Sequence, residues 1–396
     1  MYLLPVFYLI AKICVCNGTV QLMKCLESDR DALIEFKNGL DDPENRLSLW
    51  QGSNCCQWSG ISCDNSTGAV VAVDLQNPPP FYSNSSGRYV LWNLSGEVRP
   101  SLLKLKSLRN LDLSFNTFNG IPIPVFLGSL ENLQYLNLSH AGFSGTIPPN
   151  LGNLSSSEYL DVISHSNLVA DNLEWMAGLV SLKHLMMSGV DLSMVGSHWV
   201  ATLNKLLSLT ELYLSSCCLS GDIPSVSFVN FTSLAVINLG YNNLNSKIPD
   251  WLVNISTLEF VDNRVNHLYG RIPLGFGELP NLQVLSLGMN GLLRGSCFKL
   301  FRKGWKKIES LDLSKNHLSG ELPASIGKLC NLKYLDLSSN NMEGTLPESL
   351  EGIENCLSTS PLPSLHYLEL SHNQLHGKLP DWLGQLANLV HLGLAF

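Results

Sequence analysis

Charged residues make up only 15% of the 396 residues, and the few basic ones are scattered along the sequence. Acidic residues outnumber basic ones by 33 to 25, which gives a net charge of -8. This balance argues against a nucleic acid or an anionic membrane surface as the partner. The one basic cluster, at 302–307, is short, and we interpret it as a solvated outer face.

The sequence also lacks the short motifs of common catalytic sites. It contains no phosphate-binding glycine loop, no His-Glu-x-x-His metal motif and no kinase signature. Glu369, Ser371 and His372 are close in sequence, but they hold ordinary positions of a repeat and successive side chains alternate in direction. A catalytic triad is therefore not expected there. We predict that the protein is not an enzyme and carries no cofactor and no metal.

Long hydrophobic runs are absent apart from the start of the chain. Residues 1–18 are apolar for about fifteen residues, which is too short for a membrane span and typical of a signal peptide, although Lys12 interrupts the run. No other segment is long enough to cross a bilayer, so we expect no membrane segment in this chain. Together with Asn-x-Ser/Thr glycosylation sequons, this predicts a secreted or cell-surface protein. The eight sequons begin at Asn17, Asn65, Asn84, Asn93, Asn137, Asn153, Asn230 and Asn254.

The sequence does contain one motif that is repeated along most of its length. LQYLNLSHAGFSGTIPPNLGNL at 133–154 returns as LKYLDLSSNNMEGTLPESLEGI at 332–353. Twelve units follow one another in steps of 24 to 27 residues, with one step of 33. A period near 24 residues is that of leucine-rich repeats, whose stacked coils bury leucines that a single coil leaves exposed. The strand positions are Leu111, Leu136, Leu160, Leu185, Leu212, Ile237, Val261, Leu285, Leu311, Leu335, Leu368 and Leu392.

The rest of each unit has its own pattern. An asparagine three residues beyond the last strand leucine, as at Asn116 and Asn340, is expected to bind the backbone of a neighbouring coil. A Gly-x-Ile/Leu-Pro motif follows in most units and predicts a tight bend. The coils near 160, 185 and 285 lack it, and we predict short amphipathic helices at 171–179 and 197–209. The fold class is therefore α/β, a leucine-rich-repeat solenoid over 94–396 with an uncapped C-terminus.

A different segment precedes the repeats, and we interpret residues 24–75 as an N-terminal cap that covers the first coil. Ser28 and Asp31 predict a helix that begins with a capping box, and Gly39 and Pro43 predict its end. Residues 76–93 contain three consecutive prolines, and we expect them to form an insertion loop.

Four cysteines in the cap, Cys25, Cys55, Cys56 and Cys63, allow three disulfide pairings. The adjacent residues Cys55 and Cys56 rarely bond to each other, which leaves two pairings. We favour Cys25–Cys55 with Cys56–Cys63, because Cys56 and Cys63 are close in sequence. A zinc site is the rival interpretation, but its ligand spacing does not fit and a secreted context disfavours it.

Three further cysteines fall at informative positions of the repeat. Cys330 and Cys356 lie 19 and 21 residues after the strand leucines of consecutive coils, so we predict a disulfide between them. The alternative is two separate cysteines, one of them buried. Cys217 takes the asparagine position of its coil, and we expect it to be structural rather than reactive.

The cap and the repeats resemble plant extracellular receptor-like proteins. CCQWSGISC at 55–63 and AVVAVDL at 69–75 are similar to the cap of that family. The stretches at 116–154 and 295–313 resemble receptors related to the ethylene-inducing-xylanase receptor of plants. The resemblance covers the chain from Cys25 to Phe396 and implies the twisted horseshoe of the plant-specific repeat class.

Members of this family sense extracellular microbial proteins at the plasma membrane and signal through partner receptor kinases. The resemblance therefore implies an extracellular recognition module with a protein or peptide ligand. The family's further repeats, C-terminal cap and membrane helix are not in this sequence, so we expect the N-terminal part of a receptor, without the region that docks the partner kinase. The alternative is a soluble inhibitor of microbial cell-wall-degrading enzymes, similar to polygalacturonase-inhibiting proteins.

Two positions in each strand are expected to face the concave side and to contact the ligand. The residue between the strand leucines is acidic in six of twelve units, and the residue before them is frequently aromatic. Such a surface suits a polypeptide with basic groups. The alternative is that Leu-Asp-Leu-Ser is a repeat consensus that keeps the strand soluble, and a glycan on Asn137 would block part of this face. The candidate ligand-binding residues are Tyr135, Tyr159, Asp161, Tyr213, Phe260, Asp262, Asp312, Tyr334, Asp336, Tyr367 and Glu369.

Overall fold

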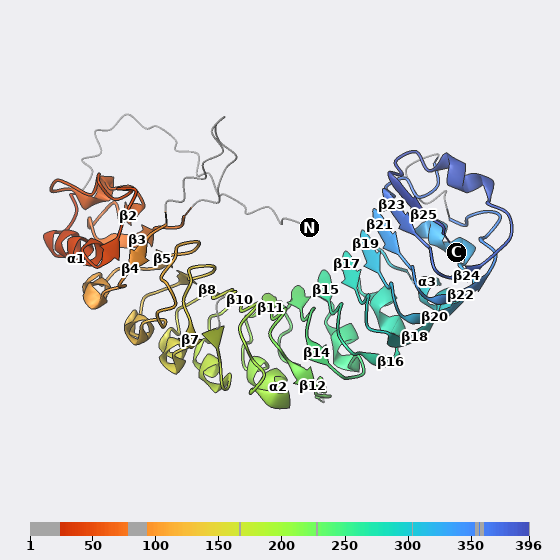
Figure 1. Ribbon diagram of the computed structural model, residues 1–396, viewed down its shortest axis with the longest axis horizontal. Coiled ribbons are helices and arrows are strands. Elements are labelled where there is room, and N and C mark those ends of the chain that lie inside the picture. Colours follow the sequence, from red (N-terminus) through yellow and green to blue (C-terminus); the bar gives the residue numbers. More distant parts are fainter. Residues whose placement is uncertain are drawn as a thin grey trace.

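The computed structural model describes residues 24–77, 93–165, 168–226, 229–302, 304–352, 356 and 360–395. The signal peptide expected at 1–18, most of the loop expected at 76–93, and the sequons at Asn17 and Asn84 lie outside these residues. The coils stack side by side into an open arc, with the labelled strands of the main sheet along its inner side and the short helices along its outer side (Figure 1). None of the helices in the described parts is long and apolar enough to cross a membrane.

The inner side of the arc is one sheet of 14 strands. All twelve predicted strand positions lie in it, and the equivalent leucines of neighbouring coils pair in register, as Leu111 does with Leu136. Each repeat strand is three residues long and holds the first strand leucine, which points inward, between two residues that point to the concave side. The strands are Ile61–Cys63 (β2), Val70–Asp74 (β3), Asn110–Asp112 (β5), Tyr135–Asn137 (β6), Tyr159–Asp161 (β8), His184–Met186 (β10), Glu211–Tyr213 (β11), Val236–Asn238 (β13), Phe260–Asp262 (β15), Val284–Ser286 (β17), Ser310–Asp312 (β19), Tyr334–Asp336 (β21), Tyr367–Glu369 (β23) and His391–Gly393 (β25).

Strands of two to five residues near the Gly-x-Ile/Leu-Pro bend form small additional sheets in several coils. A five-stranded sheet joins the later coils, and two two-stranded sheets join earlier ones. The five strands are Tyr269–Arg271 (β16), Leu292–Ser296 (β18), His317–Gly320 (β20), Asn341–Gly344 (β22) and Gln374–Leu375 (β24). The two pairs are Gly145–Thr146 (β7) with Leu168–Val169 (β9), and Ser220–Gly221 (β12) with Asn243–Leu244 (β14).

Short helices, most of them 3-10 turns, follow the bends. The helices predicted at 171–179 and 197–209 are present but shorter, as η5 and as η6 with α2. The apolar residues Leu173, Met176, Trp199 and Leu203 are buried as expected. The α-helices of the repeats are Trp199–Leu203 (α2) and Cys297–Phe301 (α3). The 3-10 helices of the repeats are Pro100–Lys104 (η2), Val125–Ser129 (η3), Pro149–Asn153 (η4), Glu174–Gly178 (η5), Gly196–His198 (η6), Asp250–Asn254 (η7), Leu274–Glu278 (η8), Ala324–Lys328 (η9) and Asp381–Gln385 (η11).

An asparagine ladder ties the coils together, as predicted. The amide of Asn340 donates to the carbonyls of Leu337 and Ser338 in its own coil and to Leu313 in the preceding one, while its Oδ1 accepts from Leu318. These bonds satisfy backbone groups that the turn would otherwise bury without partners. Cys217 substitutes in the ladder, because its Sγ lies 3.2 Å from the carbonyl oxygen of Met187 in the preceding coil.

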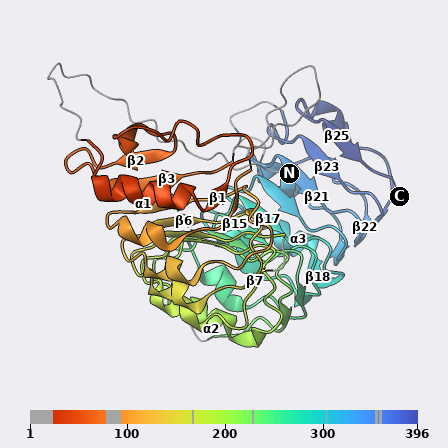
Figure 2. The ribbon, with the colours of Figure 1, turned by 60° about the vertical axis from the view of Figure 1, so that its left-hand side comes forward.

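The cap covers the first coil with helix α1, Glu27–Lys37, at one end of the arc (Figure 2). Ala32, Leu33 and Phe36 are fully buried and belong to the same hydrophobic core as the repeat leucines. The capping box predicted at Ser28 is wrong, because the helix begins at Glu27 and no side chain caps it. The start of α1 is held instead by buried Asp29, which accepts a hydrogen bond from the backbone N–H of Val70. The antiparallel pair Leu40–Asp41 (β1) and Ser95–Gly96 (β4) and the 3-10 turn Cys55–Gln57 (η1) complete this end.

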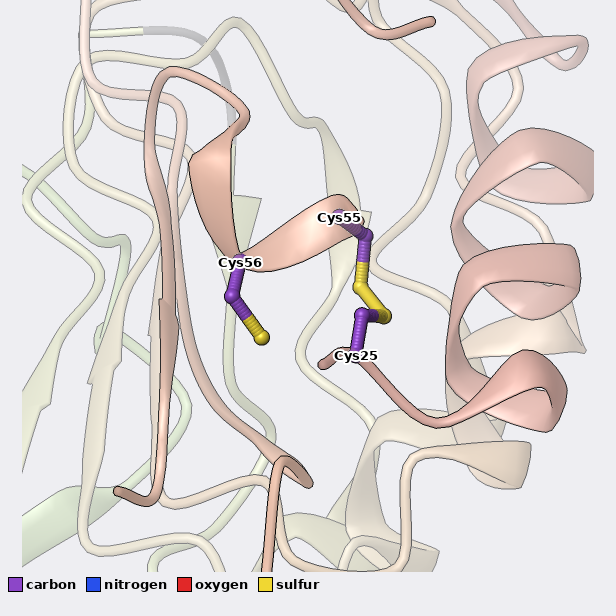
Figure 3. A group of neighbouring side chains, drawn as sticks. All are labelled: Cys25, Cys55 and Cys56. Carbon is purple, nitrogen blue, oxygen red and sulfur yellow. A yellow bond between two sulfur atoms is a disulfide. The ribbon is translucent and has the colours of Figure 1, made fainter. Parts of the chain in front are cut away.

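The disulfides of the structure match the favoured pairings. Cys25 is bonded to Cys55, and Cys56 to Cys63. The sulfurs of Cys25, Cys55 and Cys56 lie within 4.8 Å of one another (Figure 3), but disulfide sulfurs offer no thiolate, so this group is not a metal site. Cys330 is bonded to Cys356 with a Cα–Cα distance of 5.3 Å. Cys217, Cys218 and Cys297 are free cysteines of the described chain.

Candidate recognition surface

Two rows of side chains run along the concave side of the main sheet. The first row is the residue before the strand leucines, and the second row is the residue between them. Because neighbouring strands pair in register, equal positions of adjacent coils lie side by side, as Tyr334 does with Tyr367. Neither row contains a lysine or an arginine in the twelve repeats, whereas six second-row residues are acidic.

One group of aromatic and acidic side chains lies near the cap, and we define the N-terminal cluster as Asp112, Tyr135, Asn137, Tyr159, Asp161 and His184. The rings of Tyr135 and Tyr159 stack with their centroids 4.3 Å apart. The hydroxyl of Tyr135 donates to Oδ2 of Asp112 at 3.1 Å, and the amide of Asn137 donates to the same oxygen. Burial, and then the negative charge of nearby carboxylates, raise the pKa of both tyrosines. These polar groups satisfy one another, so the N-terminal cluster is a packed platform rather than a set of free contacts.

A matching group lies at the other end of the chain, and we define the C-terminal cluster as Asp312, Tyr334, Asp336, Tyr367, Glu369 and His391. The rings of Tyr334, Tyr367 and His391 form a stack with centroid distances of 4.4 and 4.2 Å. Nε2 of His391 lies 2.7 Å from Oε2 of Glu369. Burial acts to raise the pKa of Glu369, but hydrogen bonds from His391 and Ser371 together lower it. Glu369 is therefore ionised and contributes negative charge at neutral pH.

The second-row carboxylates have a structural role that the repeat consensus explains. Oδ1 of Asp336 accepts hydrogen bonds from the backbone N–H of Ser338 at 2.9 Å and from its hydroxyl at 2.6 Å. Asp112 and Asp312 bind Ser114 and Ser314 in the same way. One oxygen of each carboxylate thus closes the turn after the strand. The other oxygen is left for a ligand or a neighbour, so the structural and the binding interpretations are compatible.

Asp161 and Asp262 do not fit the expectation that they contact a ligand. They are only 5% and 4% exposed, because the neighbouring tyrosines cover Asp161 and the guanidinium of Arg264 covers Asp262. Arg264 binds Asp262 at 2.7 Å, and the pair leaves little of the carboxylate free. Burial raises the pKa of Asp161 to about 6. Neither carboxylate is exposed enough to contact a ligand directly in this structure.

The centre of the arc differs from its two ends. Tyr213 and Phe260 are half-buried there, and burial followed by the charge of Glu211 raises the pKa of Tyr213 to about 12. Arg264, two residues after Asp262, was not among the sequence candidates. The sequence does indicate this ion pair, because Arg264 stands where most coils have the serine of Leu-Asp-Leu-Ser. The concave side is therefore aromatic and acidic at both ends and carries an ion pair in its centre.

A second aromatic row near the cap was also missed from the sequence. Phe115 and His140 stack with ring centroids 4.9 Å apart, and His165 lies 5.0 Å beyond His140. These residues follow the strands, outside the two rows that the repeat pattern singles out. Burial, and then the proximity of His165, lower the pKa of His140.

The three residues considered as a catalytic triad do not form a relay. Glu369 binds the imidazole of His391 and the backbone N–H of Ser371, rather than the side chain of His372. A triad needs a histidine between the carboxylate and the serine hydroxyl, and that arrangement is not made by these three residues.

Comparison with known families agrees with this architecture. The family model of the leucine rich repeat N-terminal domain matches residues 26–64. Leucine rich repeat models match residues 107–129, 132–154, 208–228 and 364–386, and a two-copy repeat model matches 306–353. The chain is thus a leucine-rich-repeat protein with a cysteine-containing N-terminal cap.

Two of the most similar curated relatives are plant receptor-like proteins. The chain is 39% identical over 280 residues to receptor-like protein EIX1 of Solanum lycopersicum, and 35% identical over 272 residues to EIX2 of the same plant. The alignments cover 68% and 67% of this chain but 27% and 26% of the relatives, so the chain spans about a quarter of their length. The predicted resemblance to this subfamily is confirmed.

Solved structures with the same fold include ectodomains of plant receptors. The ectodomain of the Arabidopsis receptor kinase HAESA, in complex with an extended IDA peptide hormone, has a TM-score of 0.73 and 28% identity. That alignment covers 93% of this chain and 61% of HAESA. The receptor RGFR1 in complex with RGF2 has a TM-score of 0.62 and 25% identity, over 86% of this chain and 60% of that one.

Proposed function

We propose that this chain is the extracellular recognition module of a plant immune-type receptor-like protein, and that it binds a microbial or plant-derived polypeptide on its concave surface without catalysing a reaction. The similarity to EIX1 and EIX2 supports the receptor-like class. The similarity to ectodomains that hold peptide hormones supports a polypeptide as the ligand class.

The observation that carries this proposal is the C-terminal cluster. Its stacked rings are held in place by the sheet, so they can contact a ligand without first losing conformational freedom. Asp312, Asp336 and Glu369 lie in adjacent coils, and the charge of Asp336 contributes, after burial, to the raised pKa of Asp312. Carboxylates that repel one another are stabilised by a cationic partner, so a ligand with lysine or arginine side chains is favoured.

We further propose that the module acts at the extracellular side of the plasma membrane and works with a partner receptor kinase. A structure of HAESA with its peptide hormone and the co-receptor SERK1, 29% identical to this chain, supports such an arrangement for this fold. A soluble inhibitor of cell-wall-degrading enzymes has no specific feature of the structure in its favour.

The proposal is tested by binding of the secreted, glycosylated chain to a panel of purified microbial extracellular proteins that includes a fungal xylanase. Tyr367→Ala and Glu369→Gln should weaken binding of a positive panel member at least tenfold. Lys306→Ala is the matched control, because Lys306 is exposed at the basic cluster of 302–307, of which Lys303 lies outside the described residues. Equal losses from the concave and control variants, or no binding by any member, would count against the proposal.

A further inference from the structure

We propose that N-linked glycans occupy one column along the outer side of the solenoid, at Asn153, Asn230 and Asn254, and also Asn65 in the cap, whereas Asn137 on the concave side stays unmodified. This proposal rests on the export of the chain through the secretory pathway, which the proposed function requires. With this distribution of glycans, the concave surface carries none and stays accessible to a ligand.

The three column sites share one position of the repeat. Asn153, Asn230 and Asn254 each precede the strand leucine or equivalent of the next coil by seven residues. Asn153 and Asn254 are the last residues of η4 and η7, and such helices lie on the outer side of the arc (Figure 1). Since equal positions of stacked coils align, the three side chains leave the solenoid in the same direction.

The asparagine and the hydroxyl residue of each of these three sequons are accessible to solvent. The middle residue of each sequon, Leu154, Phe231 or Ile255, is buried and anchors the turn. The asparagine before it and the serine or threonine after it are exposed in all three cases. A glycan can therefore extend from the asparagine into solvent while the anchor remains in the core.

The asparagine amides at these positions are also free of strong bonds. Among the described residues, no hydrogen bond is made by the side chains of Asn65, Asn153 or Asn254. The amide nitrogen of Asn230 lies 3.5 Å from the carbonyl oxygen of Asn204, which is too long for a strong bond. Attaching a sugar to these nitrogens costs the fold little. Asn93 differs, because it is half-buried and its Oδ1 accepts from Asn77, so we leave it outside the column.

Asn137 is in the opposite situation. It is 6% exposed, and its amide donates to Oδ2 of Asp112 at 3.1 Å and to the hydroxyl of Tyr135 at 3.2 Å. Its Oδ1 accepts from both the backbone N–H and the hydroxyl of Ser139, the residue that completes the sequon. A glycan on this nitrogen would remove a donor and would have to pass between packed side chains. Chains that carry it cannot close the N-terminal cluster, so secreted folded protein should have Asn137 bare.

The direct experiment is to express the full chain in a plant secretory host and map glycosylation by mass spectrometry. Enzymatic release of glycans in heavy-oxygen water marks each modified asparagine as a labelled aspartate. The expected result is label at Asn65, Asn153, Asn230 and Asn254 and an unlabelled Asn137. Label at Asn137 in the monomeric secreted protein would overturn the proposal, as would bare column sites in a protein that is glycosylated elsewhere.

One variant tests the geometry independently of the natural sequons. Lys205 precedes Leu212 by seven residues, Leu206 is buried, and Leu207 is 59% exposed, so Lys205→Asn with Leu207→Thr builds a new sequon in the same column. We expect one added glycan on this secreted variant. A secreted variant without the added glycan would overturn the column.

The failure of this proposal is distinguishable from the failure of the proposed function. Absence of glycans from every sequon would show that the chain is not processed in the secretory pathway, and both proposals would then fall. A glycan on Asn137 would overturn the column alone and leave the ligand-binding test in place.

Discussion

Asn263 occupies the second leucine position of the strand in its coil, and its replacement by leucine should stabilise the protein. It follows Val261 and Asp262 in β15, where the neighbouring coils have buried Leu239 and Leu287. Asn263 is fully buried, and neither Nδ2 nor Oδ1 of its side chain has a hydrogen-bond partner. Its backbone groups do bond to the adjacent coils, so the cost is confined to the side-chain amide.

The size of the effect follows from the cost of burying an unpaired amide. Mutational data put that cost at about 1–3 kcal/mol, and leucine adds apolar contact that asparagine lacks. We expect Asn263→Leu to raise the free energy of unfolding by about 2 kcal/mol. Asn340→Leu is the matched control, because Asn340 makes the full set of ladder bonds, and it should lower the free energy of unfolding by about 2 kcal/mol or more.

The assay should combine urea unfolding with hydrogen exchange of residues 260–340. Because the coils of a solenoid can unfold separately, the urea midpoint of the whole protein can miss a local increase in stability. Asn263→Leu should slow exchange in β15 and β17, and Asn340→Leu should speed exchange around β19 and β21. Destabilisation by both substitutions to the same degree would refute the reasoning, because Asn263 would then have a partner such as a buried water.

Three further predictions concern titration and cysteine chemistry. Burial raises the pKa of Asp161 from 3.8 to about 6, so the folded state loses stability as the pH rises from about 4 to 6. The free energy of unfolding of Asp161→Asn should therefore equal that of the wild type at acid pH and exceed it by about 3 kcal/mol at pH 7. Urea unfolding at a series of pH values measures this difference. If the two proteins keep the same stability difference at all pH values, Asp161 is not the cause. Burial raises the pKa of Cys217 to about 12, so iodoacetamide at pH 8 should label exposed Cys218 and leave Cys217 unlabelled until the protein is unfolded, as peptide mass spectrometry would show. Replacing Cys330 and Cys356 by alanine should cost about 3 kcal/mol, and a non-reduced peptide map that shows free thiols at these positions would contradict that disulfide.

The repeat pattern predicts most of the fold because every coil repeats the same burial problem. All twelve strand positions, the asparagine ladder and the buried faces of the two helical coils follow from the spacing of leucines. Asn266 is a ladder residue, because its amide donates to the carbonyl of Leu239 in the preceding coil. The pattern does not reveal it, because the ladder position is counted from the second leucine of the strand, and Asn263 replaces that leucine. The start of α1 was also missed, since it depends on a bond between Asp29 and Val70 across 41 residues of sequence.

The candidate surface could be predicted only in part. The two rows, and the stacking of tyrosines at equal positions of adjacent coils, follow from the register. The burial of Asp161 and Asp262 does not, because it depends on the rotamers of Tyr159 and Arg264 and on how they lie over the carboxylates. The hydrogen bonding of the Asn137 amide could not be predicted either, because it depends on the side-chain conformations that bring Asp112 and Tyr135 to the same nitrogen.

We propose that the C-terminal cluster on the concave surface recognises a cationic polypeptide. The most direct test is the affinity of the secreted chain for a short synthetic peptide with regularly spaced lysines, compared with a twin in which glutamate replaces each lysine. We predict at least tenfold tighter binding of the lysine peptide. Salt should reduce this difference in affinity, Asp336→Gln with Glu369→Gln should remove it, and Lys306→Gln should leave it unchanged. Equal affinity for the two peptides, or an advantage that survives loss of both concave carboxylates, would contradict it.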